Sequence, residues 1–123
     1  MRTEIDQERV DADVVAVRVS GEIDLATVED LEGALESALS QHSGALVIDL
    51  TDCGFIDSSV LSLLVSVRRR INGSIPTPFV VIAGDQPLEV LRLTRLDQEI
   101  PVFATLADAL GALRASDDTP AAS

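Results

Sequence analysis

Residues 45–70 constrain this chain more than any other stretch. They open with a short, nearly continuous apolar run at residues 45–50, which is typical of a strand buried on both faces. A polar stretch at residues 51–57 contains Asp, Cys and Gly, and we expect the chain to turn there. A mostly apolar run then leads to three arginines. The pattern predicts a buried strand, a turn and a helix.

Two serines, Ser58 and Ser59, stand where this helix should begin. A serine at that position can accept a hydrogen bond from the free N–H groups of the first turn. Those N–H groups and the helix dipole also favour an anion. The two serines are therefore either a simple helix cap or a place for a hydroxyl that carries a phosphate.

The outward side of the predicted helix is polar. Ser62, Ser66 and then Arg69 or Arg70 recur at steps of three and four residues, which places them on one narrow stripe. Ser59 lies one step before Ser62, at the start of this stripe. We therefore expect Ser59 to face solvent or a partner.

The charge balance limits the kinds of partner. The 123 residues carry 21 acids against nine bases, a formal net charge of −12, and every base is Arg. An acidic chain is a poor ligand for nucleic acid or an anionic membrane, and a basic protein partner fits better. The absence of Lys excludes mechanisms that need a catalytic or phosphate-loop lysine.

Cysteine content and hydropathy indicate a compartment. The one cysteine, Cys53, cannot form an internal disulfide, which fits a reducing cytoplasm. The N-terminus has no apolar signal core, and no stretch is long enough to span a bilayer. We expect a cytoplasmic protein, as a monomer or weak dimer.

The rest of the chain alternates between strand and helix patterns. A hairpin is predicted from a weak edge strand at 3–10 and a clearer strand at 14–20, where apolar and other residues alternate, which predicts one face on a core. Capping boxes begin at Thr27 and Thr105, and a helix follows each. Further elements are a strand at 79–83, a helix from 84 to 96, and an edge strand at 100–103.

This order defines an α/β fold in one domain, residues 1–115, with a disordered tail at 116–123. We expect a mixed, mostly parallel sheet of about five strands, because a hairpin is followed by strand–helix–strand units. About four helices should lie mainly on one face of the sheet.

The motifs in this order resemble the STAS domain and, within it, the bacterial anti-sigma factor antagonists. The likeness runs from about Val14 to Leu113. Its most specific part is Asp57-Ser58-Ser59, and the further motifs are Gly21-Glu-Ile-Asp24, Val47-Ile-Asp-Leu50, Val90-Leu-Arg-Leu93 and Ile100-Pro-Val-Phe103.

The resemblance implies a regulatory function without enzymatic activity, cofactor or metal. In this family an ATP-binding anti-sigma factor, which is also a serine kinase, phosphorylates the second serine of the motif. That residue corresponds to Ser59, with Ser58 as the alternative acceptor. The unphosphorylated form binds the anti-sigma factor and frees the sigma factor for transcription, and a serine phosphatase resets the phosphorylated form.

The resemblance also implies a partner surface. It comprises the loop acid Asp24, the acid before the serines, and their neighbours, so we expect it to include Asp24, Thr27, Asp57, Ser58, Ser59, Val60 and Ser62. One departure is Val60, where the family usually has Gly, because a β-branched side chain would add bulk beside Ser59. This leaves open a STAS subunit of a transport ATPase or signalling scaffold that binds without phosphorylation.

Four other features have simpler interpretations. For Cys53 we favour a small buried hydrophobe or a turn residue over a redox sensor. His42 is a loop residue without further metal-type ligands at suitable spacing. Asp49 and Asp52 resemble a magnesium-dependent phosphoacceptor, but the required lysine is absent. The arginines at 68–70 are a solvated helix end.

Overall fold

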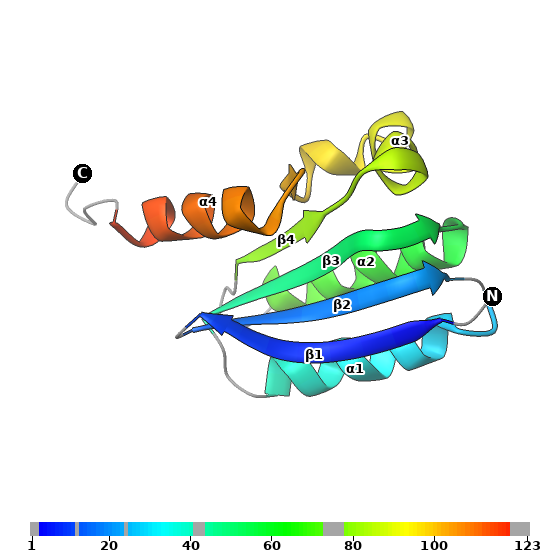
Figure 1. Ribbon diagram of the computed structural model, residues 1–123, viewed down its shortest axis with the longest axis horizontal. Helices are drawn as coiled ribbons and strands as arrows, with labels where there is room; N and C mark the ends of the chain where they lie inside the picture. The colour runs from blue at the N-terminus through cyan, green and yellow to red at the C-terminus, as the bar shows by residue number, and fades with distance from the viewer. Residues whose placement is uncertain (1–2, 12, 24, 41–43, 73–77, 119–123) are drawn as a thin grey trace.

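The computed structural model describes residues 3–11, 13–23, 25–40, 44–72 and 78–118. Over these residues one sheet has the strand order β1-β2-β3-β4-β5 (Figure 1). β1 pairs antiparallel with β2, and the remaining neighbours are parallel, which confirms the predicted mixed sheet. The strands are β1 (Glu4–Asp11), β2 (Val14–Glu22), β3 (Ala45–Phe55), β4 (Phe79–Ile82) and β5 (Val102–Phe103).

Helices follow the parallel strands. They are α1 (Val28–Ser40), α2 (Ser58–Asn72), α3 (Asp85–Leu93) and α4 (Leu106–Asp118), with a short 3₁₀ turn η1 (Leu96–Gln98) after α3. The expected helix from 84 to 96 ends early, because Arg95 adopts a left-handed conformation with φ 61°. Thr105 caps α4 through its hydroxyl, which accepts a hydrogen bond from the N–H of Asp108 at 3.1 Å. α4 continues past the expected boundary at residue 115, and residues 119–123 lie outside the described ranges.

The two faces of the sheet are covered unequally. α1 and α2 lie side by side behind the sheet in Figure 1 and build the larger core with the inward side chains of β2 and β3. α4 lies on the opposite face and covers a smaller core that includes Val14, Ala16 and Val47. The helices are thus mainly on one face, as predicted. The alternation in β2 was expected to bury a single face, but α4 also buries the other face where this strand begins.

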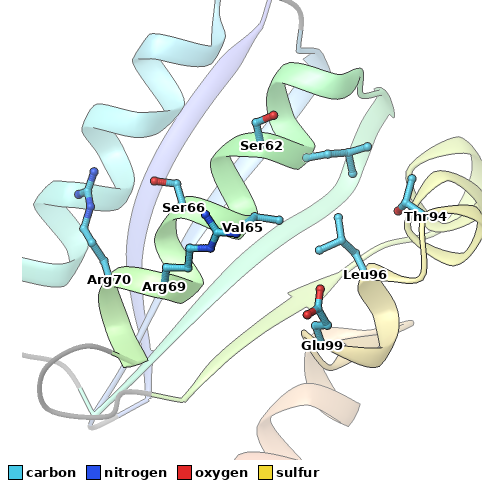
Figure 2. Close-up of a pocket in the computed structure, with 9 residues that line it drawn as sticks. Ser62, Val65, Ser66, Arg69, Arg70, Thr94, Leu96 and Glu99 are labelled. Carbon is cyan, nitrogen blue, oxygen red and sulfur yellow. The ribbon is translucent and has the colours of Figure 1, made fainter.

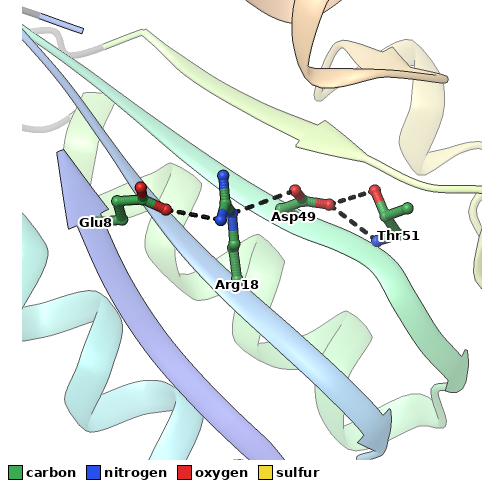
Figure 3. A network of polar contacts seen from close by, with 4 residues as sticks. All are labelled: Glu8, Arg18, Asp49 and Thr51. Carbon is green, nitrogen blue, oxygen red and sulfur yellow. Dashed lines mark hydrogen bonds and ion pairs between the residues drawn. The ribbon is translucent and has the colours of Figure 1, made fainter. Parts of the chain in front are cut away.

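Beyond α4, this second face of the sheet is polar. Arg18 pairs with Glu8 at 2.7 Å and with Asp49 at 3.8 Å. The same Asp49 carboxylate accepts hydrogen bonds from the backbone N–H, at 2.9 Å, and the hydroxyl of Thr51 (Figure 3). Because Asp49 is engaged by an arginine and a threonine, its surroundings differ from those of a metal-binding phosphoacceptor.

β3 is longer than the sequence indicates. It continues to Phe55, although a turn was expected from residue 51. Its polar end still pairs with β2, where Ser20 lies opposite Asp52 and Gly21 opposite Cys53, through irregular register steps. Gly21 permits this with φ 92°, a conformation that glycine adopts readily. The carboxyl ends of β2 and β3 consequently meet at one end of the sheet, a common place for binding sites in α/β folds.

Candidate functional site

The N-terminus of α2 is capped by Asp57. Its Oδ1 accepts a hydrogen bond from the backbone N–H of Ser59 at 2.9 Å, and its backbone oxygen accepts one from Val60 at 3.1 Å. A cap formed by the serines was one of the two interpretations that the sequence left open. The structure assigns the cap to Asp57 instead, because the carboxylate of the residue before the helix reaches the free N–H groups.

The hydroxyl of Ser59 points back to the same acid. It donates a hydrogen bond to Asp57 Oδ1, and the Ser59 side chain is half-buried. This hydrogen bond is the main cause of a lowered pKa at Asp57, and the slight burial of the carboxyl group opposes it. Asp57 therefore stays ionised, which makes it a hydrogen-bond acceptor that orients the Ser59 hydroxyl and a poor proton acceptor.

A shallow groove runs beside Ser59 between α1 and α2. Its volume is about 240 Å³, and it is lined by Val28, Glu29, Glu32, Ser59, Ser62, Leu63 and Ser66. The glutamates come from the first turns of α1, whose N-terminus lies at the same end of the molecule as that of α2 (Figure 1). Ser59 thus borders an acidic groove.

The residues predicted for the partner surface differ in their exposure to solvent. Ser58 and Ser62 are exposed, and Thr27 is half-buried at the start of α1. Val60 is an exception, because its side chain is fully buried in the larger core. The Val60 side chain points into the core, whereas Ser59 is half-buried beside the groove. The bulk of Val60 is therefore not presented to a partner. Asp24 lies outside the described residues.

Two apolar side chains at this end were missed by the sequence analysis. Leu25 is 76% exposed and Phe55 is 43% exposed. A backbone hydrogen bond of 3.2 Å from Ile23 N to Phe55 O ties their segments together at the ends of β2 and β3. Phe55 had been assigned to a turn and Leu25 to no element, and outside regular elements apolar residues carry no periodic signal. Their exposure adds an apolar component to the surface around Ser59.

The loop before α2 is held by a second residue that was missed. The side-chain amide of Gln86 in α3 accepts a hydrogen bond from Ile56 N at 2.9 Å and donates one to Ile56 O at 3.1 Å. This pair satisfies both backbone groups of the residue immediately before Asp57. α3 therefore helps to fix the position from which Asp57 and Ser59 are presented.

The charge of this region is one-sided. Residues 19–67 contain no Lys or Arg. Their acids are Glu22, Asp24, Glu29, Asp30, Glu32, Glu36, Asp49, Asp52 and Asp57. Asp49 lies on the opposite face of the sheet, but Glu29, Glu32 and Asp57 lie around Ser59, so this surface is suited to a basic partner.

The remaining candidates are Cys53 and His42. Cys53 is buried, its thiol donates a hydrogen bond to the backbone oxygen of Phe55 at 3.3 Å, and burial raises the thiol pKa, so it fits the interpretation as a small buried hydrophobe. His42 lies outside the described residues. Among the residues that the structure describes, no group of His, Cys, Asp and Glu could hold a metal ion, and no helix is long and apolar enough to cross a membrane.

Comparison with known proteins identifies the fold family. The STAS domain family matches residues 7–109, and the chain belongs to this family. Its relatives include the anti-sigma-F factor antagonist RsfB of Mycobacterium tuberculosis, which is 35% identical over 101 residues and 82% of each chain.

Solved structures agree with this assignment. An anti-sigma factor antagonist from Mycobacterium paratuberculosis has a TM-score of 0.83 and 33% identity, over 92% of this chain and 95% of that one. The Bacillus cell fate determinant SpoIIAA in its phosphorylated form has a TM-score of 0.68 and 20% identity, over 89% of this chain and 99% of that one. The second likeness concerns the fold alone.

Proposed function

We propose that this protein is an anti-sigma factor antagonist controlled by phosphorylation of Ser59. The unphosphorylated chain binds an anti-sigma factor that is also a serine kinase, and the sigma factor is released for transcription. Phosphorylation ends this binding, and a serine phosphatase restores it. The 35% identity to an anti-sigma-F factor antagonist and the Asp57-Ser58-Ser59 motif support the proposal.

The geometry of Ser59 is the observation that carries it. The hydroxyl lies in the first turn of α2, beside a groove, and is oriented by Asp57. Among the described residues, the Ser59 hydroxyl hydrogen-bonds to the Asp57 carboxylate, and no basic side chain bonds to it. An oriented hydroxyl without a base of its own suits a substrate of a kinase rather than a nucleophile of an enzyme.

Phosphoryl transfer to Ser59 places the chemistry on the partner. The Ser59 oxygen bonds to the γ-phosphorus of ATP, the bond from that phosphorus to the ADP oxygen breaks, and ADP leaves. The hydroxyl proton passes to a base of the kinase, since Asp57 has a lowered pKa. Asp57 contributes by positioning the hydroxyl.

Phosphorylation changes the local electrostatics directly. The modified oxygen no longer carries a proton to donate to Asp57, and the phosphate brings nearly two negative charges. It lies beside Asp57 and borders the groove that contains Glu29 and Glu32. The helix N-terminus stabilises part of this charge. Added charge and bulk on the contact surface then weaken binding with little change in the fold.

The buried position of Val60 favours this function over a STAS subunit that binds without phosphorylation. That alternative arose because valine was expected to obstruct the approach to Ser59. The side chain is directed into the core, so the obstruction is absent from the surface. The antagonist function also implies a cytoplasmic binding protein with no catalytic activity of its own.

Mapping the phosphorylation site tests the proposal. The anti-sigma factor that the wild-type chain binds in the native cell is purified and incubated with ATP and the wild type, Ser59→Ala or Ser58→Ala, and phosphopeptides are identified by mass spectrometry. We expect phosphate at Ser59 in the wild type and in Ser58→Ala, and none in Ser59→Ala. Equal labelling of Ser59→Ala would contradict the proposal.

A further inference from the structure

A second, larger groove lies on the other side of the exposed ridge of α2. Its volume is about 820 Å³, and it separates α2 from the α3–η1 segment. Figure 2 shows Val65 on one wall and Leu96 on the other. The lining residues are Leu61, Ser62, Val65, Ser66, Arg69, Arg70, Thr94, Leu96 and Glu99. A volume of this size falls in the range of binding pockets for organic ligands and side chains, roughly 300–1,000 Å³.

The groove has an apolar floor and a polar rim. Leu61 and Val65 are one helical turn apart and remain half-buried, and with Leu96 of η1 opposite them they form the apolar lower part of both walls, which is the floor of the groove. Ser62 and Ser66 form the ridge that also borders the smaller groove beside Ser59. An apolar floor with a polar rim is the arrangement that accepts the apolar side of an amphipathic helix.

The charge on the rim of the groove indicates what kind of partner helix would fit it. Arg70 reaches away towards α1, where it pairs with Glu36 at 2.8 Å, and Glu99 is paired with Arg68 at 3.9 Å. Arg69 is exposed and has no ion pair or hydrogen bond with any residue in the described ranges. As far as the described residues go, the groove therefore offers a guanidinium that no carboxylate pairs, on a chain whose net charge is −12.

We propose that this groove docks an amphipathic helix of a partner protein through apolar side chains on the floor and a carboxylate on Arg69. An arginine fork binds a carboxylate in a bidentate geometry, which adds direction to the contact. Ser59 and Arg69 are ten helical steps apart, about 15 Å at 1.5 Å per residue. The Arg69 contact is thus distant from Ser59, although Ser62 and Ser66 border both grooves, and the proposal does not rest on the proposed function.

A charge-swap titration with synthetic peptides tests this docking site. Two helical peptides of about three turns share leucines at i, i+4 spacing and carry either glutamates or lysines at their polar positions. Each is titrated into the ¹⁵N-labelled full chain. We expect the glutamate peptide to shift the amide signals of residues 61–70 and 94–99, and Arg69→Glu to weaken this peptide at least tenfold while strengthening the lysine peptide.

A matched variant controls for general electrostatics. Arg92→Glu makes the same charge change on an exposed arginine of α3 that does not line the groove, and it should leave both titrations unchanged. Equal effects of the two variants, or shifts confined to residues near Ser59, would overturn the proposal. Self-association of the wild type that Arg69→Glu abolishes would also overturn it, because a second copy would then fill the groove. Thermal midpoints confirm that both variants are folded.

Discussion

The two ends of α2 differ in almost every property that a partner could recognise. The first turn is capped by Asp57, carries the half-buried Ser59 and borders Glu29 and Glu32. The last turn carries Arg69 and Arg70 and borders the larger groove. Both charge patterns suit the helix dipole, so neither end costs helix stability. The difference shows how one helix can present an acidic surface that one phosphate would alter and a basic surface about 15 Å away.

The largest predicted effect compares a buried and an exposed residue near the start of α2. Val60→Gly should lower the free energy of unfolding by about 3 kcal/mol, since a buried valine is removed and glycine weakens the helix. Ser62→Gly, on the exposed ridge, should cost only about 1 kcal/mol. Urea denaturation measures both. Similar losses for the two variants would mean that Val60 is not the core anchor of this turn.

The next prediction concerns the apolar residues at the Ser59 end. Leu25→Ala and Phe55→Ala should each weaken anti-sigma factor binding by about tenfold, ~1.4 kcal/mol, because they remove exposed apolar side chains from the contact surface. Leu93→Ala is the matched control, because Leu93 is also 76% exposed but lies at the end of α3. Titration calorimetry measures the three affinities. Equal weakening by Leu93→Ala would remove the distinction between the two regions.

The smallest predicted effect is a pKa shift. In Ser59→Ala the hydroxyl donor is lost, and the lowered pKa of Asp57 should rise towards its ordinary value. Because the folded-state pKa is depressed, Asp57 contributes stability above the unfolded-state pKa, and this stability is lost as the pH falls through the folded-state pKa. In Ser59→Ala this contribution should be smaller, and the remainder, from the backbone hydrogen bonds to Asp57, should be lost at a higher pH. A ¹³C carboxyl titration by NMR measures the shift, and an unchanged pKa would show that Ser59 is not the cause.

Much of the fold was predictable because it follows from periodic apolar patterns. The buried run in β3, the apolar side of α2 and the capping box before α4 each gave a correct element. Element ends were less predictable. The polar end of β3 looked like a turn but pairs with β2 through irregular register steps, which depend on a neighbouring strand rather than on local sequence.

The site was predictable in its motif and less so in its geometry. The stripe of Ser62, Ser66 and the arginines is exposed as expected. The assignment of the cap to Asp57 and the inward direction of Val60 depend on the residue at which α2 begins, which propensity fixes only approximately. The larger groove could not be predicted, because it forms between α2 and a segment some thirty residues later in the chain.

The most direct measurement compares the affinity of the anti-sigma factor for the unmodified chain and for the chain carrying phosphoserine at position 59, by titration calorimetry at constant salt. A phosphate inside an interface disrupts it through desolvation, bulk and repulsion by a neighbouring acid, here Asp57, so phosphorylation should weaken binding by roughly 100-fold or more. The folded state should be retained, as judged by the circular dichroism of both forms. Equal affinities would contradict the central claim that a phosphate on Ser59 switches off the binding surface at the N-terminus of α2.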